Sequence, residues 1–205
     1  MEEKLQLGPS LKDAFAIGIK NCVSIVLAVL LWFITIWIPY LNVGTTIALS
    51  SLPVKLSQGN VINPTYIFDA EYRHCMGEYF ILIAIISSAI TAAMVFLLIP
   101  AIVLEFSWML AIYLLVGKKM NWALCISESN RLMMGYKMKA FALKLVVAIA
   151  LGIVGGIFFS IFKSISDNFG IFALVIIVLV SICVSISVDA VIYRELVQKA
   201  DNDLE

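Results

Sequence analysis

The sequence predicts an all-α fold: a polytopic membrane helical bundle of about six membrane segments, one of them short or re-entrant, with an amphipathic interfacial helix. Composition is the first observation, because 62% of the 205 residues are hydrophobic and only 14% are charged. Soluble domains carry about 25% charged residues. The mean hydropathy of +1.04 is the second observation. The third is that apolar runs of about 20 residues recur along the chain, with short polar stretches between them.

The first apolar run follows a helix-start signal at Pro9-Ser10 and ends at Pro39, with Trp32 near one interface, where aromatic side chains are favoured. It lacks the basic region and the cleavage site of a secretory signal, so we expect a retained membrane helix. The whole chain reads as a single integral membrane domain, residues 1–205. Its expected membrane segments are about 14–38, 43–56, 79–99, 101–116, 140–162 and 170–193, with an interfacial helix at about 121–138.

The segment at residues 43–56 decides the topology. Its apolar core is shorter than the ~20 residues that a helix needs to cross hydrocarbon, so it is either re-entrant or a short tilted helix. Basic residues favour the cytoplasmic side, and this rule places both termini there only if the chain crosses an odd number of times between residues 38 and 79. We therefore expect the short segment to cross, or nearly to cross. The basic residues behind this argument are Lys4, Lys12, Lys20, Lys118, Lys119, Arg131, Lys137, Lys139, Arg194 and Lys199.

A proline interrupts the longest apolar stretch. Read as one helix, residues 79–116 would be about 57 Å long at 1.5 Å per residue, nearly twice the ~30 Å hydrocarbon core. We therefore expect a tight break at Pro100 that makes two antiparallel spans.

The stretch SNRLMMGYKMKAF, residues 129–141, places basic residues around a lone glycine just before an apolar run. Apolar and small residues recur at helical spacing from Trp122 to Tyr136, which predicts an amphipathic helix, and Gly135 fits a bend into the next span. The basic face suits anionic lipid headgroups of the inner leaflet. The alternative is a solvated linker helix. The residues expected at the headgroup interface are Arg131, Lys137 and Lys139.

The same stretch carries a family resemblance. It resembles the signature of a bacterial multi-helix membrane protein family that includes the membrane domain of glycerophosphoryl diester phosphodiesterases and uncharacterised stand-alone relatives. Ala101 and Glu105 depart from the pattern, since the family often has glycine at the first position and a small or basic residue near the second. The resemblance implies a six-helix membrane fold and little about activity. The motif positions are Ser129, Met133, Gly135, Lys137 and Phe141.

Glu105 is the first candidate site residue. It lies five residues after Pro100, about 7–8 Å into its helix at 1.5 Å per residue. A carboxylate within the membrane predicts a functional site, because a charge there is costly. We interpret Glu105 as a candidate contact for an ion, a proton or a polar substrate. The alternative is a hydrogen bond near the outer interface, beside Ser107 or Trp108.

Lys144 and Asp189 are the second candidate. Each lies a few residues inside the inner end of its span, on consecutive antiparallel helices. Because either charge alone would be costly in lipid, the shared depth predicts a structural ion pair. A proton relay is the alternative.

Small residues recur every four positions on three spans, and such faces let helix backbones approach closely. They predict helix packing, with a hydroxyl-lined pore as the alternative. These positions are Ala84, Ser88 and Ala92, then Gly152 and Gly156, then Ser181 and Ser185.

The sequence holds no nucleophile elbow, phosphate loop or zinc spacing, so we expect neither an enzyme nor a metal or cofactor. The four cysteines form no CxxC pair and read as small hydrophobes. The polar cluster before the second long span has residue types that suit a metal, but its spacing favours a solvated charged face. That cluster is Asp69, Glu71, His74 and Glu78.

The sequence thus predicts a non-enzymatic polytopic membrane protein: a scaffold, an accessory subunit or an envelope-homeostasis factor. The alternatives are a small transporter or channel that uses Glu105, and a lipid-handling membrane protein. Expected partners are membrane lipids, with a second copy or other membrane proteins as further candidates. The net charge of zero gives no reason to expect nucleic acid. The expected location is the bacterial inner (plasma) membrane, with both termini in the cytoplasm.

Overall fold

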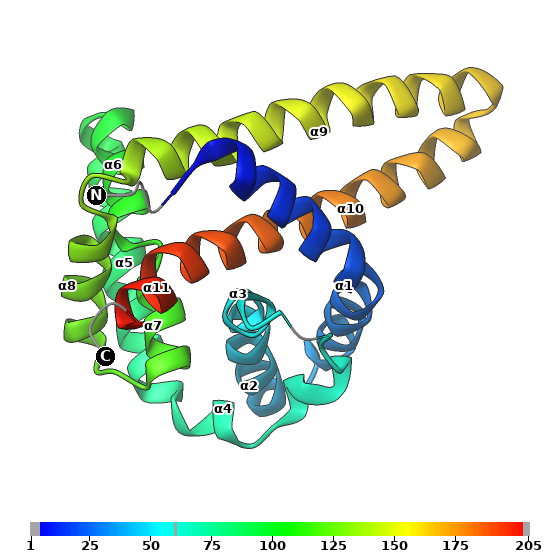
Figure 1. Cartoon of the computed structure of the whole chain (residues 1–205). Helices are drawn as coiled ribbons and strands as arrows, with labels where there is room; N and C mark the ends of the chain where they lie inside the picture. Colours follow the sequence, from blue (N-terminus) through cyan, green and yellow to red (C-terminus); the bar gives the residue numbers. More distant parts are fainter. Residues whose placement is uncertain (1–4, 60, 203–205) are drawn as a thin grey trace.

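The computed structural model describes residues 5–59 and 61–202, and every regular element in these residues is helical, which confirms the all-α prediction (Figure 1). Lys4, one of the basic residues behind the predicted orientation, lies outside the described residues. The elements are α1 (Leu7–Thr35), α2 (Pro39–Ser50), α3 (Leu52–Ser57), η1 (Pro64–Phe68), α4 (Glu71–His74), α5 (Met76–Phe96), α6 (Leu98–Trp108), α7 (Ala111–Lys118), α8 (Trp122–Met133), α9 (Lys137–Ile165), α10 (Asp167–Tyr193), the π-helix η2 (Arg194–Gln198) and α11 (Lys199–Asn202).

Five helical stretches are long and apolar enough to cross a membrane, which makes the chain a membrane-embedded helical bundle. The sixth expected segment, residues 43–56, is also helical but is divided between α2 and α3 at Ser51. The 12 residues of α2 extend about 18 Å, short of the ~30 Å hydrocarbon core. Whether this segment crosses stays a prediction. The five stretches are Leu7–Thr35, Met76–Phe96, Leu98–Lys118, Lys137–Ile165 and Asp167–Asp201.

α2 folds back along the end of α1 through polar side-chain contacts. Pro39 begins α2, a position where its missing N–H removes no helical hydrogen bond. Trp32 Nε1 donates a hydrogen bond to Thr46 Oγ1 at 2.8 Å, and the hydroxyls of Thr35 and Thr45 lie 2.8 Å apart in the interior. Such hydroxyl contacts join neighbouring helices without exposing polar groups to lipid.

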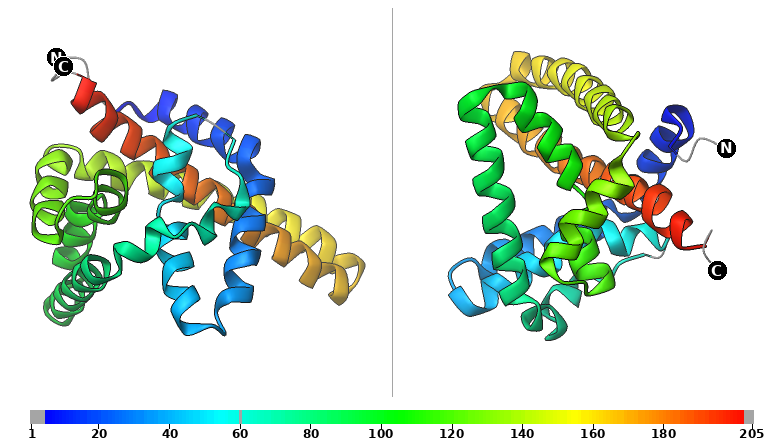
Figure 2. Two further views of the ribbon diagram at one scale, coloured as in Figure 1. Left: turned by 90° about the horizontal axis from the view of Figure 1, so that it is seen from below. Right: turned by 90° about the vertical axis from the view of Figure 1, so that its left-hand side faces the viewer.

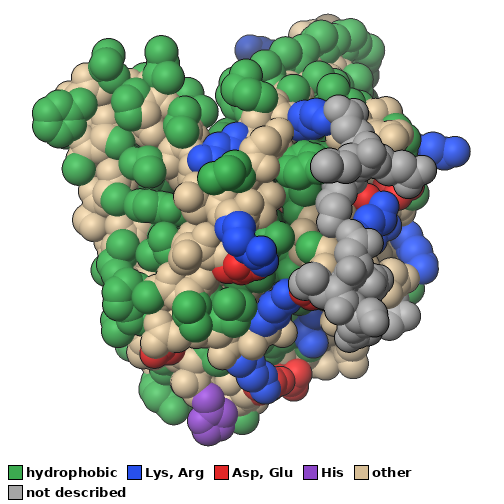
Figure 3. Space-filling model, turned by 60° about the vertical axis from the view of Figure 1, so that its left-hand side comes forward, with side chains coloured by type: hydrophobic (Ala, Val, Ile, Leu, Met, Phe, Trp, Pro, Cys, Tyr) green, Lys and Arg blue, Asp and Glu red, His purple; other side chains and the backbone are tan. Residues whose placement is uncertain are grey.

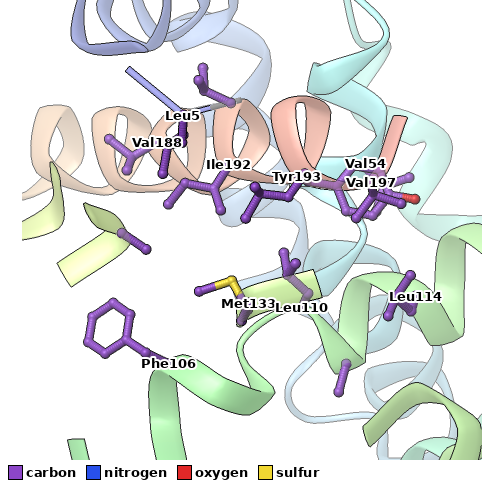
Figure 4. Close-up of a cluster of buried hydrophobic side chains, with 14 of the residues drawn as sticks. Leu5, Val54, Phe106, Leu110, Leu114, Met133, Val188, Ile192, Tyr193 and Val197 are labelled. Atoms are coloured by element: carbon purple, nitrogen blue, oxygen red, sulfur yellow. The ribbon is translucent and has the colours of Figure 1, made fainter. Parts of the chain in front are cut away.

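Three hairpins, α1/α2, α5/α6 and α9/α10, point in different directions from a common centre (Figures 1 and 2). We name this centre the hub, and we name the α5/α6 hairpin and residues 148–182 of the α9/α10 hairpin the arms. In the hub core, Ile192 and Tyr193 of α10 lie beside Met133 of α8 and Leu110 (Figure 4). The hub consists of residues 5–18 of the first helix and its lead-in, α3, α7, α8, and residues 183–198 of α10 and η2.

The break between α5 and α6 falls at Leu97, so the expected break at Pro100 is wrong by three residues. Leu97 is extended (φ −165°, ψ 146°), and its N–H still donates to the carbonyl of Ala93 at 3.0 Å. Pro100 is the third residue of α6. A proline is tolerated in the first turn because the N–H groups there have no intrahelical acceptor.

The interfacial helix α8 is shorter than the expected range of 121–138. Asn121 caps its start by accepting a hydrogen bond from the N–H of Ala123 at 2.9 Å. The helix ends at Met133, and the predicted bend follows at Gly135, whose φ of 85° is left-handed. Glycine reaches that conformation without the clash that a Cβ would cause.

The close contact between α9 and α10 uses a different glycine from the predicted ones. A Cβ added at Gly155 would lie 2.8 Å from Ile177 Cγ2, whereas at Gly152 and Gly156 it would meet nothing within 4 Å. Gly152 and Gly156 therefore meet no described helix of this chain, and their predicted role in helix packing stays a prediction. Both faces of α9 are apolar here, so the sequence pattern could not show which one meets α10.

Candidate functional site: a charge network where hub and arms meet

The structure brings together the two residues that the sequence pairs, and it adds a third. Lys144 Nζ lies 2.7 Å from Asp189 Oδ1. Tyr113 Oη donates a hydrogen bond to Asp189 Oδ2 at 2.9 Å. The three residues belong to α9, α10 and α7 respectively, so this charge network joins three helices at the point where the α9/α10 hairpin leaves the hub.

Aromatic rings surround the charge network. The Lys144 ammonium lies 6.0 Å from the centroid of the Phe106 ring, which packs edge-on against Phe141 at 5.6 Å between centroids. Tyr113 packs edge-on against Tyr193 at 6.2 Å. The side chain of Asp189 is only 17% exposed, so the pair is screened less than a surface salt bridge.

The two oxygens of Asp189 have different partners. Oδ1 is buried, and its contact among the described residues is the Lys144 ammonium at 2.7 Å. Tyr113 holds the second oxygen through its hydroxyl. This arrangement can fix the angle between hub and arm, or pass a proton within the network. The structural role needs no change of protonation state.

The family motif residues join α8 to its neighbours. Ser129, fully buried, donates a hydrogen bond from Oγ to the carbonyl of Ser107 in α6 at 2.8 Å. Met133 is fully buried in the hub core, and Phe141 contacts Phe106 as described. Lys137 donates to Asn130 Oδ1 at 3.1 Å across the Gly135 bend. Each motif residue thus has a structural role, since Gly135 supplies the left-handed bend.

The basic residues expected at lipid headgroups have contacts within the chain. Arg131 pairs with Glu128 at 2.5 Å, and this hydrogen bond lowers the pKa of the Glu128 carboxyl below its ordinary value. The Lys139 ammonium lies 5.7 Å from the centroid of the Tyr136 ring. Arg131 stays 70% exposed at its side chain, so it remains accessible to a headgroup, whereas Glu128 offsets its charge.

Glu105 does not belong to the charge network. It is exposed on α6 and forms no hydrogen bond or ion pair with the part of the chain that the structure describes. Its neighbour Ser107 instead donates to the carbonyl of Val103 at 2.6 Å. Glu105 as an ion or substrate contact stays a prediction.

The members of the polar cluster predicted from the sequence, Asp69, Glu71, His74 and Glu78, do not form one site. Glu71 pairs with Lys119 at 2.6 Å, and Glu78 accepts a hydrogen bond from the N–H of Trp122 at 2.9 Å, at the start of α8. Over residues 5–59 and 61–202, no group of three or more His, Cys, Asp or Glu side chains could hold a metal ion.

Two cysteines lie in contact between α1 and α10, with 3.4 Å between the Sγ atoms of Cys22 and Cys183. Burial raises the pKa of the Cys125 thiol to about 11, so it stays protonated and unreactive at neutral pH. These contacts fit the prediction of cysteines as small packing groups.

The sequence analysis missed the role of Tyr113 and the ion pairs of η2, which directly follows α10. Arg194 pairs with Asp13 and Glu195, and Glu195 also accepts from Lys199. A tyrosine within an apolar run is a weak signal, because a lipid-facing tyrosine looks the same in sequence. No family model, curated protein or solved structure matches this chain.

Proposed function

We propose that the chain is a non-enzymatic multi-pass protein of the bacterial inner membrane that acts as a scaffold, an accessory subunit or an envelope-homeostasis factor. In this proposal the hub fixes the geometry, and the arms bind other membrane proteins or a second copy of the chain. The family resemblance at residues 129–141 supports the bacterial origin.

Low burial of α5 and α9 is the observation that carries the proposal. Within an apolar 18-residue stretch of each helix, only 6% of the residues of α5 and 6% of those of α9 are buried inside the chain, against 28% for Leu7–Thr35. Lipid alone can cover such helices. The small residues that these helices expose favour a protein partner in addition to lipid.

Both arms present small residues on open faces. On α5, Ala84, Ser88 and Ala92 recur every four residues and all are exposed. On α9, Gly152 and Gly156 are exposed, with open space where side chains would stand. Membrane helices use such faces for close backbone contact. The chain does not use these faces itself, so they are free for a helix of another molecule.

The proposed orientation puts the hub at the cytoplasmic side. The start of α1 and the end of α11 lie on one side of the molecule, away from the tip of the α1/α2 hairpin (Figure 2). Lys and Arg side chains gather over this part of the surface, whereas the upper lobes are mainly hydrophobic (Figure 3). Basic residues favour the cytoplasmic side.

Lipid handling is the second candidate, favoured by one feature. Figure 3 shows a notch between two hydrophobic lobes, with a basic side chain near its floor. Separately from that view, the Lys144 ammonium of α9 lies 6.0 Å from the centroid of the Phe106 ring of α6. Apolar walls with a cation at the base suit an anionic lipid.

Photocrosslinking in intact membranes tests the proposal. A benzophenone amino acid is placed at Thr91 on α5 and at Ile153 on α9, with Lys12 on the hub as the matched exposed control. We expect discrete protein adducts from both arm positions and none from Lys12. Adding Ala84→Leu and Ser88→Leu should remove the Thr91 adduct, because leucine blocks close approach.

The outcome also separates the two candidates. Lipid adducts alone at Thr91 and Ile153, with no protein adduct, would overturn the scaffold proposal in favour of lipid handling. Adducts of equal yield at Lys12 would show that the arms have no special role.

A further inference from the structure

We propose that a pocket on the hub binds a phosphate-bearing anion. The pocket has a volume of about 130 Å³ and lies where α3, α4 and the end of α7 meet. None of the three residues of the charge network lines it, so it is a separate site. The lining residues that matter here are Ser51, Lys55, Gln58, Glu71, Tyr72 and Lys119.

Lys55 carries the proposal because its ammonium lacks an acceptor. The side chain is half-buried, and the ammonium lies 5.2 Å from the centroid of the Tyr66 ring. It forms no hydrogen bond or ion pair with any residue in the described ranges. An ammonium carries three donors, and no described residue accepts a hydrogen bond from those of Lys55. An anion in the pocket would supply the missing acceptors.

Several basic residues in or near the hub have acceptors within the chain, and Lys12 is exposed to solvent, whereas Lys55 is half-buried. Two of the three residues that the sequence assigns to lipid headgroups, Arg131 and Lys137, are in this group. The pairs are Lys118 with Asp201, Arg131 with Glu128, Lys137 with Asn130, Arg194 with Asp13, and Lys199 with Glu195.

Lys119 supplies a second cation at the pocket. It adopts the left-handed conformation (φ 52°) that ends α7, which is uncommon for a residue with a side chain and clusters at functional sites. Its ammonium lies 2.6 Å from Glu71 Oε1. The hydrogen bond from Lys119 lowers the pKa of Glu71, so this carboxylate is ionised at neutral pH. Two ammonium groups and one carboxylate leave a net positive pocket.

The volume and the position of the pocket limit which ligands it can bind. Sites for drug-sized molecules have about 300–1,000 Å³, so a volume of about 130 Å³ admits one small anionic group. The hydroxyls of Ser51 and Tyr72, 3.2 Å apart, and the Gln58 amide add neutral hydrogen-bonding groups. The span Leu98–Lys118 ends beside Lys119, which puts the pocket at headgroup depth. The shared chemistry is a phosphate group, from an anionic lipid headgroup or from free phosphate.

Two binding measurements on the purified full-length protein test the proposal and identify the source. In phosphatidylcholine nanodiscs, inorganic phosphate is titrated by calorimetry. In nanodiscs that also contain phosphatidylglycerol, native mass spectrometry counts the lipid molecules retained. We expect Lys55→Gln to weaken binding about tenfold, the loss of one charge-assisted hydrogen bond. Lys12→Gln, an exposed lysine elsewhere on the hub, should leave binding unchanged.

A variant with the opposite sign makes the test specific. Glu71→Gln removes the carboxylate that competes for Lys119, so it should tighten anion binding about threefold. Lys55→Arg should keep binding, which guards against a Lys55→Gln protein that fails to fold. If only inorganic phosphate binds, the ligand is a free anion. If only phosphatidylglycerol is retained, the ligand is a lipid headgroup. The proposal would be overturned if neither phosphate nor phosphatidylglycerol binds. It would also be overturned if Lys55→Gln and Lys12→Gln weaken binding equally, or if Glu71→Gln weakens binding.

Discussion

The two halves of α10 are both apolar, yet they lie in opposite environments. Between residues 183 and 193, most side chains are buried in the hub, and Val191 and Ile192 are fully covered. Between residues 167 and 182, only Gly170 and Ala173 are buried, and Ile171 is 65% exposed. Hydrophobicity therefore does not distinguish protein core from lipid-facing surface in this chain. The polar groups do.

Polar contacts mark the hub half. Ser187 is buried and donates to the carbonyl of Cys183 at 2.8 Å, Asp189 holds Tyr113 and Lys144, and Glu195 follows in η2. In a membrane, side-chain polar groups and small residues specify which helices meet, because lipid tails are as apolar as leucine. The hub is fixed by such contacts, and the arms are left open.

Breaking the charge network should have the largest effect. Lys144→Leu leaves the Asp189 carboxylate without a counter-ion, and we expect it to lower the free energy of unfolding by about 2–3 kcal/mol. Unfolding in mixed micelles measures this. Lys163→Leu on the arm is the control and should change it by less than about 0.5 kcal/mol, because this lysine lies over the Phe159 ring and has no ion pair with a described residue.

Exchange of the two charges sharpens the same comparison. A protein with both Lys144→Asp and Asp189→Lys should recover part of the lost stability if the two residues pair directly. A double variant no more stable than the worse single variant would argue against that pairing.

A large side chain placed between the two helices of the arm should have the next largest effect. Gly155→Leu places a side chain against Ile177, and we expect a loss of about 1–2 kcal/mol from overpacking between α9 and α10. Gly156→Leu, one residue along, faces open space and should leave the purified protein's stability unchanged. Thermal unfolding of both variants in one detergent checks this. Equal destabilisation would mean that the Gly156 face is packed after all.

A single hydrogen bond of the hub should have a smaller effect. Ser129→Ala leaves the carbonyl of Ser107 without its donor, which should cost about 1 kcal/mol in unfolding free energy. Ser127→Ala, on the exposed side of α8, is the control. If the two alanines are indistinguishable, Ser129 does not secure α8 to α6.

The surface pair on α8 should have the smallest effect, and it depends on pH. The pKa of Glu128 is lowered in the folded protein, so the pair adds stability above the ordinary pKa of 4.5 and loses it as the pH falls through the lowered value. Arg131→Gln should reduce the unfolding free energy by about 0.3–0.5 kcal/mol at neutral pH, as for other exposed pairs. That difference should vanish in acid. A difference that grows in acid would contradict the assignment.

The sequence was informative where polar residues break the apolar pattern. The amphipathic face of α8, the bend at Gly135 and the approach of Lys144 to Asp189 all follow from charge and spacing. Sequence reasoning failed where every side of a helix is apolar. The break at Leu97 and the packing role of Gly155 depend on which face meets a neighbour, and a uniformly apolar helix does not show it.

Labelling of the wild-type protein by a carbene reagent dissolved in the bilayer tests the division into hub and arms most directly. The purified protein is reconstituted without partners, and adducts along α10 are mapped by mass spectrometry. We predict adducts on the outer half, at Ile171, Phe172 and Val175, and none at Val188 or Val191. Equal labelling of both halves, or labelling confined to the inner half, would contradict a closed hub with open arms.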